Sequence, residues 1–469
     1  MFLCLRDPIA IYKIIIFSCK INAENQLKKK LSLEIFKKTV FPSLKFTFFV
    51  FYFFFSFQFI FKQKRLYLKY DDINIGRFIT AEVYKNFSTY NSKLLFFFSF
   101  FKNLIIAGKL LNSAEKYLKN KNIDAIYIDH CGYINGVLYS YFSKKKIIIY
   151  SNNFPRTIYK IDFKKENNYY TQYENSLITS KKVKLTKLKL KKCKNLLKNI
   201  FSVPNKLQHM AKIKYNTISK TNYKSFDYVI YAHSFTDGQL WYGLDQFENT
   251  LDWIKFTLNF FKNSKKKVLI KGHPNFYEKS IGLLSEWDKK IYLKLKKEYS
   301  VYKNFHFIDE PIFNYDLIKK LNKKCILISH HGTVILEGAN YGFKTICSNA
   351  NFFNSYFKIS NCWSNIKDYR KLLAKDYKKL HLTNKSDLYS LIYNTFIDDF
   401  SYNGKKFWQY IIAKQLNMSL KDYKKIIETF YGVNNHSKSK KYFGILLGKK
   451  FKKTVNILQK NIQELEYKK

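Results

Sequence analysis

Two short apolar segments that each end in a histidine-bearing turn constrain the fold of this chain more than any other feature. They are VLIKGHPN, residues 268–275, and ILISHHGTVILEGANYGFKTICS, residues 326–348. In each segment three apolar β-type residues lead into a polar turn, and a helical pattern follows. This order is typical of a parallel α/β sheet, in which the carboxyl ends of the strands carry the chemistry.

The second turn has the layout of an anion site. Ser329, His331 and Gly332 precede a helix that we expect to start at Thr333 and to carry Glu337 one turn later. Free N–H groups at a helix start suit a phosphate, and Glu337 could accept hydrogen bonds from ribose hydroxyls. A helix that is simply capped by Thr333 explains the same pattern, so both interpretations stay open.

The first turn places a cation and an imidazole where a strand must stop. Pro274 cannot continue the hydrogen-bonded ladder, so His273 is fixed at the strand end with Lys271 beside it. A single histidine in such a place is more often structural than catalytic. Two such turns in neighbouring βα units face one crevice, and this favours a binding site.

The KGHPN and SHHGTVILEGANYGFKTI segments resemble the motifs of the capsule polysaccharide biosynthesis glycosyltransferases, roughly K-x-HP and HGT-x-x-x-E-x-x-x-x-G. Upstream, YAHSFTDGQLWYGLDQFENTLDWIKFTL is similar to that family's histidine-rich turn and the helix that follows it. The resemblance covers residues 226–348 well and the rest loosely. It implies an α/β fold of GT-B type, in which two Rossmann-like, doubly wound domains face a cleft, here with a helical C-terminal extension.

The resemblance also implies roles for individual residues. His273 would act on the donor phosphate with Lys271 as an electrostatic helper, and Glu337 would hold the ribose. The backbone at Gly332 and Thr333 would hold the phosphate. The full substrate-binding set comprises the polar residues of these turns, namely Lys271, Ser329, His331, Gly332, Thr333, Glu337, His233 and Asp237.

Two further catalytic candidates lie in the N-terminal half. Residues 123–136 contain a short predicted strand that ends near His130, which would face the cleft from the acceptor side. A capping role for this histidine stays open. Asp72, next to Asp71 in a polar turn, could supply a catalytic base, but we favour an acid pair that stabilises a helix N-terminus.

Composition and the resemblance together predict four segments, and the resemblance alone implies the roles of the two middle ones. Residues 1–65 form an apolar N-terminal segment, 66–225 an acceptor-side α/β domain with a lysine-rich linker, 226–400 the nucleotide-sugar domain, and 401–469 a helical extension with a basic tail. The most apolar run, residues 46–61, is shorter than the roughly 20 residues of a membrane span, so we predict a core helix or a helix in the membrane interface.

The net charge of +50 suggests an anionic partner, although a compositional bias toward lysine explains it equally well. No nucleic-acid-binding motif accompanies the charge, so we predict no nucleic-acid partner. The seven cysteines show no zinc or disulfide spacing and indicate a cytoplasmic protein. A lysine-rich helix within residues 181–198 could hold it at the inner face of a membrane.

The expected function is transfer of a sugar from a nucleotide-sugar donor to a glycan or lipid-linked acceptor in surface polysaccharide synthesis. No Asp-x-Asp triplet occurs, so we predict no metal and no cofactor. A nonhydrolysing sugar-nucleotide 2-epimerase shares the fold and a His-Pro-Asn turn, but it has paired glutamates where Gly338 follows Glu337 here. Two more functions stay open, a glycerol-phosphate polymerase-like transferase and a non-enzymatic, basic, membrane-associated assembly factor.

Overall fold

The protein is seen in a computed structural model. The description covers residues 2–3, 41–119, 125–129, 132–145, 147–153, 156–161, 164–166, 169–171, 184–202, 215–216, 221–240, 243–277, 283–351, 357–393, 397 and 443–447. The candidate His130 and most of the predicted extension 401–469 lie outside these residues.

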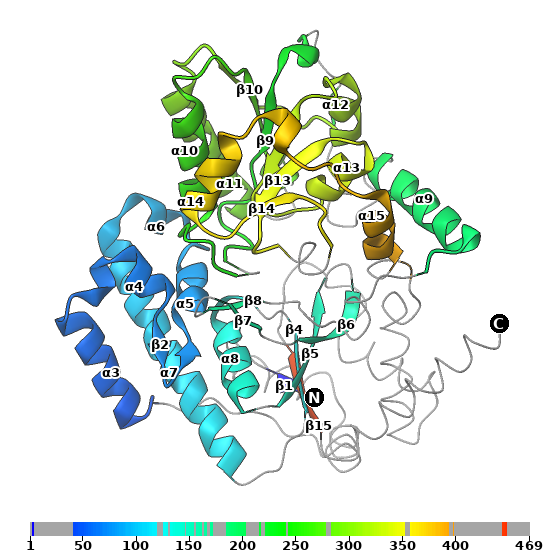
Figure 1. Cartoon of the computed structure of the whole chain (residues 1–469). Coiled ribbons are helices and arrows are strands. Elements are labelled where there is room, and N and C mark those ends of the chain that lie inside the picture. The colour runs from blue at the N-terminus through cyan, green and yellow to red at the C-terminus, as the bar shows by residue number, and fades with distance from the viewer. Residues whose placement is uncertain are drawn as a thin grey trace.

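The C-terminal half contains a six-stranded sheet in which neighbouring strands run parallel (Figure 1). The strand order is β11-β10-β9-β12-β13-β14, which is the 3-2-1-4-5-6 order of a Rossmann-like sheet. The strands are β9 (Tyr228–Tyr231), β10 (Val268–Lys271), β11 (Phe305–Ile308), β12 (Ile326–Ser329), β13 (Lys344–Ser348) and β14 (Asn361–Trp363). The two strands that the sequence analysis predicted in this half are therefore confirmed as β10 and β12.

Helices cover both faces of this sheet because the strands are apolar on both sides. Ile230, Ile270 and Ile328 face one core, and the alternate residues Val229 and Leu269 face another. The first core is closed by α10 (Thr250–Phe261), α11 (Leu283–Tyr299) and α14 (Ile366–Leu373), and the second by α12 (Asn314–Lys320). The remaining helices of this half are α13 (Val334–Asn340), α15 (Lys385–Ile392), η4 (Tyr223–Ser225), η5 (Pro274–Tyr277) and η7 (Tyr377–Lys379).

The lysine-rich segment forms helix α9 (Lys187–Ser202), which packs onto the C-terminal half. Its apolar side chains Cys193, Leu197 and Phe201 are buried in a core that also contains Ile335 of α13 and Leu388 of α15. The lysines of α9 therefore lie on the outer side of a docked helix.

The N-terminal half is built mainly from helices around a phenylalanine-rich core. They are α3 (Leu44–Phe55), η1 (Gln58–Ile60), α4 (Lys62–Leu66), α5 (Gly76–Val83), α6 (Phe87–Asn91), α7 (Lys93–Lys119), η2 (Tyr133–Asn135) and α8 (Gly136–Lys144). Gly108 lets α7 approach α3, since a Cβ at that position would lie 2.4 Å from the Phe46 ring. The prediction for residues 46–61 was a core helix or a helix in the membrane interface, and α3 packs on the core with one face, through Phe46, Val50 and Phe53.

A five-stranded sheet accompanies these helices, and it differs from the predicted second Rossmann-like sheet. Its order is β1-β15-β4-β5-β6, and only β4 and β5 pair in parallel. The strands are β1 (Phe2–Leu3), β4 (Ala125–Asp129), β5 (Ile148–Asn153), β6 (Arg156–Ile161) and β15 (Phe443–Leu447). The predicted helical extension is wrong at β15, because this segment completes a sheet of the N-terminal half. Two hairpins, β2 (Lys69–Tyr70) with β3 (Ile73–Asn74) and β7 (Lys164–Glu166) with β8 (Tyr169–Thr171), stand apart from it.

One helix in the described part of the chain, within residues 93–116 of α7, is long and apolar enough to cross a membrane by length and composition alone. One third of its most apolar window is buried inside the protein. The buried residues Phe100, Leu104 and Ala107 belong to the core of the N-terminal half. We therefore interpret α7 as a core helix with one outward face.

Candidate active site

Four histidines gather at the carboxyl edge of the six-stranded sheet. His233 follows β9, His273 follows β10, and His330 and His331 follow β12. The ring centroid of His233 lies 3.8 Å from that of His331 and 5.0 Å from that of His273. The strands before β12 are added on one side of β9, and the later strands are added on the other side, so the strand order reverses between β9 and β12. Ligands of such sheets bind in the crevice at this switch point.

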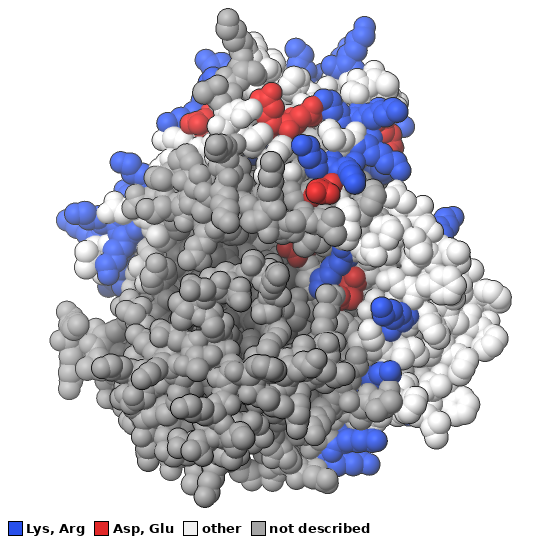
Figure 2. Space-filling view, turned by 180° about the vertical axis from the view of Figure 1, so that it is seen from behind, with Lys and Arg blue, Asp and Glu red and all other residues white. Residues whose placement is uncertain are grey.

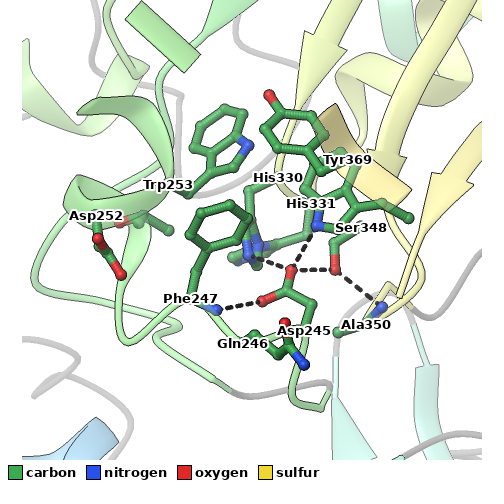
Figure 3. A network of polar contacts seen from close by, with 12 residues as sticks. Asp245, Gln246, Phe247, Asp252, Trp253, His330, His331, Ser348, Ala350 and Tyr369 are labelled. Atoms are coloured by element: carbon green, nitrogen blue, oxygen red, sulfur yellow. Dashed lines mark hydrogen bonds and ion pairs between the residues drawn. The ribbon is translucent and has the colours of Figure 1, made fainter. Parts of the chain in front are cut away.

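Asp245 anchors the buried side of this cluster (Figure 3). Its Oδ2 lies 2.9 Å from His330 Nε2, and it accepts hydrogen bonds from Ser348 Oγ at 2.5 Å and from Trp363 Nε1 at 3.0 Å. Burial acts to raise the pKa of Asp245, but His330 and the hydrogen bonds from Ser348 and the Phe247 N–H outweigh it, so the pKa lies below its usual value. The site therefore holds a buried carboxylate beside an imidazole.

The contact between His330 and His331 links the tautomers of the two rings. The two Nδ1 atoms are 2.8 Å apart, so one must donate and the other must accept. A neutral His330 donates its Nε2–H to Asp245, which leaves its Nδ1 to accept from His331. His331 then carries a lone pair on Nε2, the arrangement of a general base that is backed by a buried acid.

Two imidazoles of the cluster, those of His233 and His331, have lowered pKa values. Burial lowers the pKa of His233 to about 4. Burial also lowers the pKa of His331 well below its usual value, and the neighbouring His233, His330 and His273 add to the effect. Gly238, at φ +70°, leaves room beside the two rings, since a Cβ there would lie 3.3 Å from His233 Cε1 and 3.5 Å from His331 Nε2.

The loop after β9 is held in place by the buried Asp288 of α11. This carboxylate accepts hydrogen bonds from the Ser234 hydroxyl at 2.5 Å and from the Phe235 N–H, the Thr236 N–H and the Thr236 hydroxyl, each at 2.9 Å. Burial raises the pKa of Asp288 to about 7, although these hydrogen bonds oppose the shift. Four donors of one loop thus depend on a single side chain.

We expect Asp288→Ala to destabilise the protein by about 3 kcal/mol, because it leaves several buried donors without an acceptor. Urea unfolding measures the change. Glu298→Ala is the matched control on the same helix, since Glu298 makes an exposed ion pair with Lys255 and should contribute less than about 1 kcal/mol. Equal losses in the two variants would contradict the assigned role of Asp288.

Lys271 and Glu337 lie close together beneath the cluster. The Lys271 side chain is 5% exposed, and burial lowers its pKa to about 8 while Glu337 opposes the shift. Burial raises the pKa of Glu337, against a hydrogen bond from the Asn314 amide and the charge of Lys271. The Tyr231 hydroxyl is also buried here and has no hydrogen-bond partner among the described residues. The group thus combines a desolvated cation with a carboxylate and a free hydroxyl.

The turn between β12 and α13 is only partly as predicted. The helix begins at Val334, and Thr333 stands at its N-cap, but the Thr333 side chain makes no capping hydrogen bond. The interpretation of a helix capped by the threonine side chain is therefore wrong. Ser329 Oγ donates to the His331 carbonyl at 3.0 Å, and Gly332 has φ +136°, which a larger side chain would rarely adopt.

The N-terminal half reaches this site through Tyr133. Its hydroxyl hydrogen-bonds to the Asp237 carboxylate and accepts from the Gly238 N–H at 2.7 Å. The Lys85 ammonium lies 3.4 Å from the centre of the Tyr133 ring. Asp237, predicted to bind substrate, is thus a contact between the two halves of the chain. A second contact joins Arg65 to Glu248, at 2.6 Å.

Asp72 is not brought to the histidine cluster by any contact in the described part of the chain. It lies with Asp71 in the exposed turn of the β2–β3 hairpin, where both residues have positive φ, and Asp71 pairs with Lys45. The favoured interpretation of an acid pair at a helix N-terminus is wrong, because α5 begins only at Gly76.

Asp245, His330 and Tyr133 are residues of the site for which the sequence predicted no role. Asp245 lies in the irregular segment that precedes α10, and this helix begins at Thr250 because Asn249 caps it.

In the described part of the chain, no group of three His, Cys, Asp or Glu side chains is arranged to hold a metal ion.

The sequence matches no family model, and no curated protein is significantly similar to it. A solved structure with some likeness is KpsC of Thermosulfurimonas dismutans, a beta Kdo 2,4 transferase, with 10% sequence identity and a TM-score of 0.34. The match covers 55% of this chain and 76% of that one. At such values the likeness says nothing of activity.

Proposed function

We propose that the protein is a glycosyltransferase that moves a sugar from a nucleotide-sugar donor to a glycan or lipid-linked acceptor. The observation that carries the proposal is the cluster of four histidine side chains at the switch point of a Rossmann-like sheet, backed by the Asp245–His330 pair. The resemblance of the KGHPN and SHHGT motifs to capsule-type transferases supports it.

In this proposal the six-stranded sheet binds the nucleotide and the N-terminal half presents the acceptor, as in a GT-B enzyme. The partly exposed His273 contacts the diphosphate, together with the backbone at Gly332 and Thr333. The buried ammonium of Lys271 adds positive charge, and Glu337 binds the ribose. Such preorganised groups stabilise the negative charge that develops on the leaving nucleotide.

The histidine pair gives the proposed reaction a path for its proton. The acceptor hydroxyl loses its proton to His331 Nε2, and the Nδ1 proton of His331 passes to His330 Nδ1. The acceptor oxygen bonds to the anomeric carbon, and the bond from that carbon to the phosphate oxygen breaks with its electron pair on the phosphate. The positive charge comes to rest on His330, beside the carboxylate of Asp245.

A panel of CMP, UDP, GDP and CDP in a thermal-shift assay tests nucleotide binding, because a ligand that binds only the folded state raises its apparent stability. We expect one nucleotide to raise the unfolding temperature. No shift with any of the four would favour the basic assembly factor. Turnover of a nucleotide sugar without any acceptor would favour the 2-epimerase.

We expect activity to survive EDTA. The sequence has no Asp-x-Asp triplet to hold a divalent cation against a diphosphate, and in its place the site offers the ammonium group of Lys271 and the N–H donors of its histidine turns. The measurement is the initial rate of sugar transfer with and without chelator. Complete loss that magnesium or manganese restores would show that the side chains do not suffice.

The lipid-linked acceptor of such an enzyme places the proposed reaction at the cytoplasmic face of a membrane. The protein would work there as a peripheral enzyme. The charge of +50 suits an anionic leaflet, since each Lys or Arg near such a surface contributes about 1 kcal/mol.

A further inference from the structure

Helices α3 and α7 together expose an aromatic face that the fold leaves uncovered among the described residues. On α3 the exposed side chains repeat at helical spacing, and on α7 a second stripe runs beside them. The face consists of Leu44, Phe48, Phe51, Tyr52 and Phe55 of α3, of Phe57, Ile60 and Phe61 after it, and of Leu94, Leu95, Phe98 and Phe101 of α7. Phe48 is 72% exposed and Phe55 is 76% exposed.

The opposite sides of the same helices hold the core, so the aromatic face is rigid. Phe53 of α3 stacks on Phe100 of α7, with ring centroids 6.1 Å apart, and both are buried. Phe54 packs edge-on against Phe97 and Phe101 of α7. A membrane span by α7 would remove Phe100 from this core, and an orientation parallel to the membrane keeps it.

The charged side chains of the segments that form the aromatic face are basic, and Asp71 of the β2–β3 hairpin pairs with one of them, Lys45. Residues 41–70 and 85–114 contain no Asp or Glu, while exposed lysines stand beside the apolar stripes. These lysines are Lys45, Lys64, Lys93 and Lys102. Seen from behind, the flank where Figure 1 places α3 and α7 is a broad uncharged surface with scattered basic residues (Figure 2).

We propose that this aromatic face lies in the interfacial layer of an anionic membrane. Exposed phenylalanine side chains with lysines around them are the pattern of helices that rest in the headgroup region, with the lysine ammonium groups near lipid phosphates. A second copy of the chain is a poorer occupant, because a symmetric pair would bring lysines against lysines, and among the described residues the ion pair with Asp71 neutralises Lys45 but not Lys64, Lys93 or Lys102.

This surface is separate from the lysine-rich helix that the sequence suggested as the membrane contact. Helix α9 lies on the other flank of the molecule from α3 (Figure 1). Its apolar side chains Cys193, Leu197 and Phe201 are buried in the core that α13 and α15 share, so apart from the exposed Leu188 it offers a membrane mainly charge. Attachment through α9 would therefore be lost in high salt, whereas attachment through the aromatic face would persist in part.

The test is flotation of the full-length protein with vesicles of phosphatidylglycerol and phosphatidylethanolamine, in low and high salt. We expect Phe48→Ser/Phe55→Ser/Phe98→Ser to weaken binding at least about tenfold, since it removes three inserted rings. The matched control is Leu188→Ser/Val301→Ser/Leu382→Ser, which removes exposed apolar side chains elsewhere and should bind like the wild type. Unfolding temperatures close to that of the wild type would show that both variants fold.

Three outcomes would overturn the proposal. One is equal vesicle binding by the aromatic-face variant and the wild type. Another is complete release of the wild type by high salt, which would assign the contact to lysines alone. The third is a wild-type dimer that the aromatic-face variant converts to a monomer, which would make a second copy the occupant. None of these results depends on transferase activity.

Discussion

His273→Ala is expected to lower kcat for sugar transfer by about 10²–10³-fold and to leave the fold intact. The residue follows β10 and directly precedes Pro274. The centroid of its ring lies 5.0 Å from that of His233 in the cluster. Loss of one donor aimed at the developing charge typically has an effect of this size. Its partial exposure means that truncation leaves little buried cavity.

His306→Ala is the matched control for this variant. His306 lies in β11 of the same sheet but is exposed, away from the cluster. Initial rates for the two variants and the wild type, with unfolding temperatures as a check, decide the question. Wild-type turnover in His273→Ala would remove this residue from the mechanism.

Asp245→Asn is expected to lower kcat by about 10²–10³-fold with little change in KM. The carboxylate accepts from His330, Ser348 and Trp363, and an amide at this position would have to turn a donor toward one of them. Without the negative charge, His330 can no longer hold the transferred proton, so the general base fails although it remains in place.

The pH profile separates this positioning role from a structural one. Asp245 stabilises the protonated form of the pair His330–His331, so its removal should lower the pKa of the pair and move the acidic limb of the kcat/KM profile to lower pH. Ser348→Ala is the matched control, because it removes one hydrogen bond to Asp245 and keeps the charge. An unmoved acidic limb in Asp245→Asn would mean that the network only supports the fold.

Local pattern was sufficient to predict strands β10 and β12 of the six-stranded sheet and the turns that follow them. β10 and β12 are apolar runs bounded by polar turns, and the information that places His273 and His331 at strand ends lies within a few neighbouring residues. The burial of Lys271 and its proximity to Glu337 were not predicted, because they depend on how strand β10 and helix α13 pack together.

Other features depend on contacts between distant residues. Asp245 meets His330 from an irregular loop that has no periodicity, and Tyr133 reaches Asp237 from the other half of the chain. The pairing of β15 with β4 joins segments far apart in sequence, which composition alone does not reveal. The sequence analysis missed the outward face of α7 because lysines interrupt the apolar run in the sequence. On a helix, these lysines are placed beside an apolar stripe.

The most direct test of the account is isothermal titration calorimetry. The nucleotide that the thermal-shift panel identifies is titrated into the wild-type protein and into the Glu337→Gln variant. The account predicts saturable binding by the wild type and about tenfold weaker binding by the variant, because loss of one charged hydrogen bond to the ribose removes about 1–2 kcal/mol. Glu286→Gln, an exposed change on α11, should bind like the wild type. Unchanged affinity in Glu337→Gln, or no heat of binding in the wild type, would contradict a nucleotide site at this edge of the sheet.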